Sequence, residues 1–143
     1  MRILILNGPN LNLLGMREPG IYGTETYETL CAMCKEHGQA KGAQVSCYQS
    51  NHEGDLIDTI QAANGVYDGI VFNPGAYTHY SYALYDALKA ISVPCVEVHI
   101  SDIHEREDFR RISVIAPACV KQICGMGLKG YLLAMDHFLG EPA

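Results

Sequence analysis

Polar side chains of a few types gather where three of the apolar runs of the sequence end. Arginine side chains suit a carboxylate, and amide, hydroxyl and imidazole groups suit hydroxyls, so this inventory favours a small, anionic, hydroxylated ligand. The residues are Asn7, Asn10, Asn12, Arg17 and Tyr22 after the first run, Asn73, Thr78 and His79 after a later one, and His99, Ser101, His104, Arg106, Arg110 and Arg111 after the next.

The segment 7–23, "NGPNLNLLGMREPGIYG", is much longer than the usual strand-to-helix connection of about two to six residues. It contains neither GxGxxG nor GxxxxGK[ST] and does not open directly into a helix, so a phosphate-binding loop is not favoured. Its glycines flank Arg17 and Tyr22 as hinges flank a lid. An ordered turn held by asparagine side chains fits the same spacing equally well.

The histidines of these segments do not favour a metal centre. His79, His99 and His104 lack a convincing single-helix metal spacing, and few carboxylates accompany them. We therefore predict no metal site. The other histidines, at positions 37, 52 and 137, are interpreted as surface or structural residues.

The pair Cys31-x-x-Cys34 has a spacing found in redox and zinc sites. Redox pairs lie at a helix N-terminus, where the thiol pKa is lowered, whereas this pair falls about two turns into an expected helix. No second Cys/His pair at zinc spacing follows it. All six cysteines are interpreted as reduced, structural residues.

The elements that position these side chains alternate between strand and helix. Such alternation predicts parallel pairing with right-handed crossovers and helices on both faces. The expected fold is α/β and flavodoxin-like, a five-stranded parallel sheet of order 2-1-3-4-5, with ligands outside the carboxyl ends of strands one and three. We expect strands at 2–7, 44–49, 69–73, 95–100 and 119–124, helices at 25–41, 53–64, 79–90 and 127–139, and a single catalytic domain over 1–143.

Composition excludes several function classes. The 143 residues carry a formal net charge of −6, so the chain has no excess of Lys and Arg for general nucleic-acid binding. It has no run of about 18 apolar residues that could span a membrane. The opening "MRILIL" meets Asn7-Gly8-Pro9 too soon for a secretion signal, so a cytoplasmic location is expected.

Five longer stretches closely resemble the type II 3-dehydroquinate dehydratase (3-dehydroquinase) family, in the family's order and spacing from residue 3 to about 136. They are "ILNGPNLNLLGMREPGIYG", "SNHEGDLID", "VFNPGAYTHYSYALYDAL", "VEVHISDIHEREDFR" and "GYLLAM". The resemblance implies reversible dehydration of 3-dehydroquinate to 3-dehydroshikimate through an enolate, without metal or organic cofactor. It also implies a role in the shikimate pathway (aromatic amino acid biosynthesis) or in quinate catabolism, and a homo-oligomer, a dodecamer built of trimers.

The resemblance also implies roles for residues at matching positions. Tyr22 resembles the base that removes the C2 proton, with Arg17 beside it, and His99 resembles the acid that protonates the departing C1 hydroxyl. Asn10 resembles the residue that stabilises the enolate with an ordered water, and Glu97 would support His99 from behind. Asn73, His79, Ile100, Ser101 and Arg110 would hold the substrate, and Asp86 would reach the site of a neighbouring subunit. On this view the long loop is a lid that delivers an activated tyrosine and excludes water.

The sequence departs from the family pattern without losing a proposed catalytic group. Tyr80, Tyr82 and Tyr85 replace smaller, aliphatic or basic residues and bring the subunit contacts into question. Packing in an interface or core is the favoured interpretation of these tyrosines. Ile112 and Ala116 replace a common histidine and serine.

Three alternatives remain open from the sequence. The dehydration has a second chemical route through a Schiff base on lysine, but all five lysines lie outside the three polar segments. A flavodoxin-like module could instead bind a nucleotide, phosphate or flavin in the same crevice, with Thr24 and Thr26 near phosphate. A family member that has lost its activity is the third, although every matching catalytic residue is present.

Overall fold

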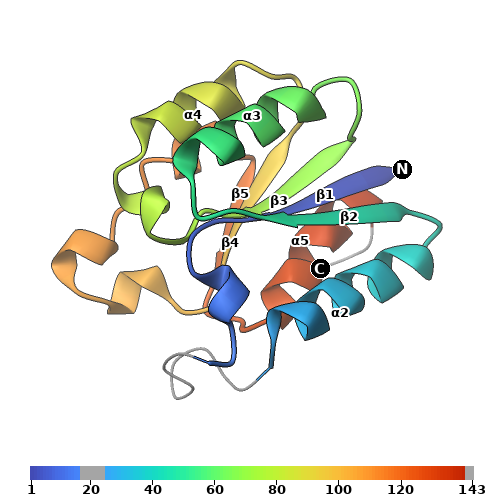
Figure 1. Cartoon of the computed structure of the whole chain (residues 1–143), viewed down its shortest axis with the longest axis horizontal. Coiled ribbons are helices and arrows are strands. Elements are labelled where there is room, and N and C mark those ends of the chain that lie inside the picture. The colour runs from blue at the N-terminus through green and yellow to red at the C-terminus, as the bar shows by residue number, and fades with distance from the viewer. Residues whose placement is uncertain (17–24, 141–143) are drawn as a thin grey trace.

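A computed structural model describes residues 1–16 and 25–140, in which a parallel sheet separates two layers of helices (Figure 1). The five strands pair in parallel in the order β2-β1-β3-β4-β5. This order and the helices on both faces confirm the predicted flavodoxin-like fold. The strands are β1 (Arg2–Asn7), β2 (Gln44–Gln49), β3 (Gly69–Asn73), β4 (Cys95–His99) and β5 (Lys121–Cys124).

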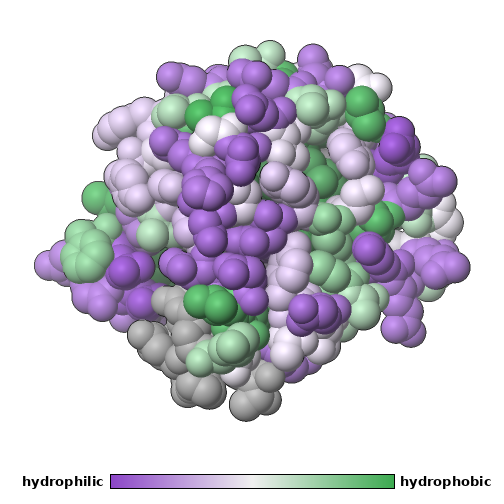
Figure 2. All heavy atoms as spheres, viewed as in Figure 1, coloured by the Kyte–Doolittle hydropathy of each residue, from purple (hydrophilic) through white to green (hydrophobic). Residues whose placement is uncertain are grey.

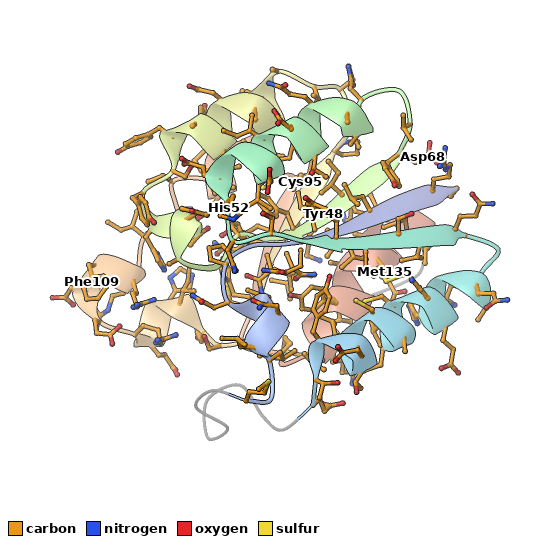
Figure 3. The ribbon with its side chains drawn as sticks, in the orientation of Figure 1. Tyr48, His52, Asp68, Cys95, Phe109 and Met135 are labelled. Atoms are coloured by element: carbon orange, nitrogen blue, oxygen red, sulfur yellow. The ribbon has the colours of Figure 1, made fainter. Side chains whose placement is uncertain are left out.

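Helices α3 (Glu53–Ala63) and α4 (Tyr82–Lys89) cover one face of the sheet, and α2 (Tyr27–Gln39) and α5 (Lys129–Leu139) cover the other (Figure 1). Because successive strand residues point to opposite faces, the sheet contributes to two separate apolar cores. Cys95 packs in the core under α3 and α4, whereas Met135 packs on the α2 and α5 side (Figure 3).

The three strands β1, β3 and β4 are buried on both faces, as nearly continuous apolar runs in a parallel sheet require. Each ends in a polar residue at the same edge of the sheet, namely Asn7, Asn73 and His99. In the register of β1 and β3, Asn7 lies directly opposite Asn73. The sheet therefore delivers polar groups to one place at its carboxyl edge.

The prediction that a helix begins at residue 79 is wrong. Residues Gly75–His79 form a 3-10 helix, η2, and α4 begins only at Tyr82. The reason is Ser81, which has extended backbone angles and caps α4, since its Oγ accepts a hydrogen bond from the Leu84 amide at 3.1 Å.

Five other elements are shorter than predicted, and two of them, α3 and β4, only end one residue early, at Ala63 and His99. The helix expected over 25–41 spans Tyr27–Gln39 because Thr26 caps it, with its Oγ1 accepting from the Thr29 amide. The strand expected over 119–124 is confined to Lys121–Cys124, because the preceding 3-10 helix η5 (Ala116–Ala118) carries a proline at its start. The last helix begins at Lys129 rather than 127.

Short 3-10 helices surround the carboxyl edge of the sheet (Figure 1). They are η1 (Leu11–Leu13), η2, η3 (Ile103–Glu105) and η4 (Asp108–Arg110). Phe109 lies at the outer end of this region and points away from the body of the chain (Figure 3). Hydrophilic side chains predominate across the upper and central part of the face in Figure 2, with apolar ones scattered among them. None of the helices within residues 1–16 and 25–140 is long and apolar enough to cross a membrane.

Candidate active site

A pocket of about 110 Å³ opens at the carboxyl ends of β1, β3 and β4. This is the switch point at which a sheet of this order binds ligands, because the chain leaves neighbouring strands in opposite directions there. Its walls mix amide, imidazole and guanidinium groups with a few apolar side chains. The lining residues are Pro9, Asn10, Leu11, Leu14, Asn73, Gly75, Ala76, His79, His99, Ile100, Ser101, Ile103, Arg106 and Arg110.

Asn10 is held in an uncommon backbone conformation at the entrance of η1. Its φ of 71° places it in the left-handed region, which asparagine tolerates better than most residues. The Asn10 amide donates to Asn51 Oδ1 at 3.0 Å, and the same oxygen accepts from the Gln49 side chain. Asn51 belongs to the segment "SNHEGDLID", so that stretch anchors the loop that carries Asn10.

His99 lies against a fully buried carboxylate at the end of β4. Its Nε2 is 2.5 Å from Glu97 Oε2, and the side chain of His99 is only 7% exposed. Two hydroxyls complete the cluster, with Thr78 Oγ1 at 2.5 Å from Glu97 Oε2 and Ser113 Oγ at 2.9 and 3.0 Å from the two carboxylate oxygens. Glu97 and His99 both belong to β4, whereas Thr78 and Ser113 lie 19 and 16 residues from Glu97 in the sequence.

Glu97 is ionised in this cluster. Burial alone would raise its pKa, but the hydrogen bond and charge of His99, with the hydroxyls of Thr78 and Ser113, outweigh burial and hold the pKa below the usual 4.5. An ionised carboxylate only accepts hydrogen bonds, so Nε2 of His99 must donate. The other ring nitrogen, Nδ1, is therefore the one that can exchange a proton with a ligand in the pocket.

His79, unlike His99, offers a hydrogen-bond acceptor to the pocket. Burial, together with the charges of His99 and Arg110, lowers its pKa despite the hydrogen bond to the Ile112 carbonyl, so the ring is neutral near pH 7. Its Nδ1 lies 2.8 Å from that carbonyl and must donate to it. Nε2 is consequently an acceptor, suited to a ligand hydroxyl.

Asn73 is oriented by a second buried cluster. Its Nδ2 donates to Tyr131 Oη at 2.9 Å, and its Oδ1 accepts from the Gly75 amide at 3.0 Å. The Tyr131 hydroxyl then donates to Asn7 Oδ1 at 2.6 Å. With one amide hydrogen engaged by Tyr131, Asn73 has one N–H left for a ligand.

Two arginines make the pocket locally positive in a chain that is negative overall. Arg106 Nη1 donates to Ser101 Oγ at 3.3 Å, which places this guanidinium beside the loop that follows β4. Arg110 Nε lies 3.1 Å from Glu107 Oε2. These groups fit a ligand that carries a carboxylate.

Most of the predicted site residues meet in the pocket. Asn10, Asn73, His79, His99, Ile100, Ser101 and Arg110 all line it, and Glu97 does not line it but contacts His99. Arg17 and Tyr22 lie outside the described residues. Asp86 is on α4 and does not line the pocket of this single chain.

The predicted site omitted four residues that the structure brings to it. Arg106 lines the pocket, and Thr78, Ser113 and Tyr131 hold the pocket residues from behind. Arg106 and Thr78 belong to the polar segments that follow the predicted strands, so their position in the sequence could have indicated a place in the site. Ser113 and Tyr131 lie outside those segments, and their partners are distant in sequence.

The described part of the chain gives no geometric support to the rival interpretations. Within it, no group of three or more His, Cys, Asp or Glu side chains is arranged to hold a metal ion. The six cysteines are free thiols, and Cys34 is buried in the core between α2 and the sheet. Thr26, a candidate for phosphate, is the N-cap of α2. None of the lysines lines the pocket.

A flavodoxin-like parallel sheet with a polar, arginine-bearing pocket at the switch between β1 and β3 fits an α/β protein that binds a small anion. Comparison with known proteins defines the family. The model of the class II dehydroquinase family matches residues 1–139. The chain therefore belongs to the class II dehydroquinase family.

Individual relatives agree with this assignment. The chain is 59% identical over 134 residues to the 3-dehydroquinate dehydratase of Ruegeria pomeroyi, covering 94% of this chain and 90% of the relative. The crystal structure of type II dehydroquinase from Butyrivibrio crossotus superposes with a TM-score of 0.94 at 58% identity, covering 99% and 98% of the two chains. The type II dehydroquinase from Propionibacterium acnes gives the same TM-score at 44% identity, covering 98% and 97%.

Proposed function

We propose that this pocket carries out the reaction of the class II dehydroquinases, the reversible removal of water from 3-dehydroquinate to give 3-dehydroshikimate. The enzyme is a hydro-lyase of the second type, which uses no Schiff base. The observation that carries the assignment to this pocket is His99, held by the buried Glu97 carboxylate at the wall of a cavity that two arginines also line. The cavity thus combines a proton donor with groups that bind a carboxylate.

The substrate's groups match the polarity of the walls. Its carboxylate would lie toward Arg110 and the Ile100–Ser101 segment, because this part of the cavity carries positive charge and hydroxyl donors. Its hydroxyls would meet the acceptor Nε2 of His79 and the remaining N–H of Asn73. The ring would then stand with its departing hydroxyl near His99.

The reaction proceeds in two proton transfers. Tyr22 acts as the base that removes the proton from C2, and the electron pair passes to the neighbouring ketone to form an enolate. Asn10, with a water molecule, stabilises the enolate. His99 then gives a proton to the C1 hydroxyl, which leaves as water while the enolate collapses to the conjugated ketone. Leu14, which lines the pocket, precedes Arg17 by three residues in the sequence.

The assembly and cellular role belong to the same proposal. We place the chain in a homo-dodecamer of trimers in the cytoplasm, in the shikimate pathway or in quinate catabolism. Asp86, which lies away from the pocket of its own chain, would reach the site of a neighbouring subunit. The exposed side chains of Tyr80 and Tyr82, at 60% and 70%, are available to such an interface.

The test is to add 3-dehydroquinate to purified, chelator-treated protein and to follow the ultraviolet absorbance of the conjugated enone. A steady rise is expected, together with its loss in Tyr22→Phe. No rise from folded, assembled protein would overturn the proposal. Inactivation by borohydride in the presence of substrate would contradict a mechanism without a Schiff base.

A further inference from the structure

Two hydroxyl side chains that do not line the pocket contact the Glu97 carboxylate. Thr78 Oγ1 lies 2.5 Å from Glu97 Oε2, and Ser113 Oγ lies 2.9 Å from the same oxygen and 3.0 Å from Oε1. The two hydroxyls are also 3.0 Å from each other. We infer that Thr78 and Ser113 are positioning residues, whose hydroxyls fix the Glu97 carboxylate in the orientation that aligns His99 for proton transfer. This inference rests on the proposed role of His99.

The directions of these hydrogen bonds follow from counting protons. Ser113 Oγ accepts from the Ala116 amide at 3.0 Å, so its own proton is free to go to the carboxylate. Thr78 Oγ1 has one proton, and its 2.5 Å contact directs that proton to Glu97 Oε2. With His99 Nε2–H, the carboxylate then has three donors. All three hydrogen bonds can therefore form while Glu97 is ionised.

Thr78 connects the segments that line the pocket with the Glu97 carboxylate. It is fully buried, and its backbone carbonyl accepts from the Val114 amide at 2.8 Å, which ties η2 to the segment that follows η4. Its neighbour His79 lines the pocket, as does Arg110 at the end of η4. The hydroxyl pair therefore joins the segments that bind substrate to the carboxylate behind the proton donor.

A purely structural role makes a different prediction from a positioning role. If the hydroxyls only stabilise the fold, their removal lowers the free energy of unfolding but leaves the rate per folded enzyme unchanged. If they position Glu97, removal lowers kcat in enzyme that is fully folded, while the KM for substrate changes little. The loss of kcat must also depend on the presence of the Glu97 carboxylate.

The first experiment measures kcat and KM for 3-dehydroquinate in Thr78→Val and Ser113→Ala. We expect kcat to fall about tenfold or more in each, because each variant removes one hydrogen bond to a charged group. Thr78→Ser and Ser113→Thr keep the hydroxyls and should restore most of the rate. Thr59→Val is the matched control, since its hydroxyl donates to the Asp55 carbonyl within α3, away from the pocket. Unchanged kcat in both hydroxyl deletions would overturn the inference.

The second experiment repeats Thr78→Val in a Glu97→Gln background. If Thr78 acts through Glu97, its deletion should change kcat by less than about twofold there, because no carboxylate remains to be aligned. A full, additive loss would overturn the inference. The variant His99→Ala distinguishes failure of this inference from failure of the proposed function. Near-normal kcat in His99→Ala would show that His99 is not the proton donor, independently of the results for Thr78 and Ser113.

Discussion

Two buried polar clusters lie beneath the pocket, and they differ in charge. The cluster around Glu97 is ionised and ends on His99, a group that transfers a proton. The cluster around Tyr131 is neutral and ends on Asn73, a group that can only donate or accept hydrogen bonds. Both include residues at or near the carboxyl ends of buried strands, so the same sheet edge supports two different tasks. A charged cluster can stabilise a charge that develops on its neighbour, whereas a neutral one can only fix an orientation.

The largest expected effect is on the ionised cluster. His99→Ala removes the proton donor, and a positioned general acid contributes about 10²–10⁴ in rate, so kcat should fall by about 10³. Steady-state kinetics by enone absorbance measures this, with His137→Ala on the surface of α5 as a control. A fall of less than tenfold would show that the ionised cluster does not drive proton transfer.

Substrate binding should depend on the arginines that line the pocket. Arg110→Ala removes a charged donor from the pocket, and a hydrogen bond to a charged group is worth about 1.5–3 kcal/mol. The KM for 3-dehydroquinate should rise by roughly 10- to 100-fold. Arg111→Ala is the matched control, because that guanidinium pairs with Asp108 and does not line the pocket. Equal effects of the two variants would refute a specific role for Arg110.

The neutral cluster should contribute to the free energy of unfolding. Tyr131→Phe removes the hydroxyl between Asn7 and Asn73 and leaves two buried amides short of a partner. Unfolding in urea should show a loss of about 2 kcal/mol, since each unsatisfied buried group costs about 1–3 kcal/mol. Tyr48→Phe on the exposed side of β2 should cost much less. A negligible loss in Tyr131→Phe would mean that the amides find other partners.

The ionised cluster should reveal itself in the pH dependence of stability. The pKa of Glu97 is held below 4.5, so its ionisation stabilises the fold above that value, and the contribution disappears as the pH falls through the lowered pKa. The free energy of unfolding of the unsubstituted protein should therefore decline below about pH 4.5 more steeply than that of Glu97→Gln. Parallel curves from pH 7 to pH 3 would contradict an ionised Glu97.

The sequence predicted the sheet well because strands buried on both faces leave a plain signal. The apolar runs 2–7 and 69–73 coincide with β1 and β3, and the alternating run 44–49 coincides with the partly exposed edge strand β2. The rule that polar residues follow parallel strands onto one edge also brought Asn73, His79 and His99 together correctly. Helix ends were less predictable, since the start of α4 depends on the capping by Ser81 rather than on apolar periodicity.

The partners behind the pocket could not be read from sequence. Thr78 and Ser113 are 19 and 16 residues from Glu97, and Tyr131 is 58 residues from Asn73. Thr78 stands in one of the polar segments that follow the predicted strands, which marked it as a candidate. The specific contacts of all three residues could not be predicted, because they depend on how loops pack across the sheet. Arg17 and Tyr22 were assigned by family resemblance and remain predictions.

The most direct test of the difference between the clusters is to measure kcat and KM of Glu97→Gln and Tyr131→Phe under identical conditions. Glu97→Gln should lose roughly 100-fold in kcat with KM near that of the unsubstituted protein, because it alters only the group behind the proton donor. Tyr131→Phe should raise KM several-fold and leave kcat within about threefold, because Asn73 only orients the substrate. The same division between kcat and KM in both variants would contradict the assignment of separate tasks to the two clusters.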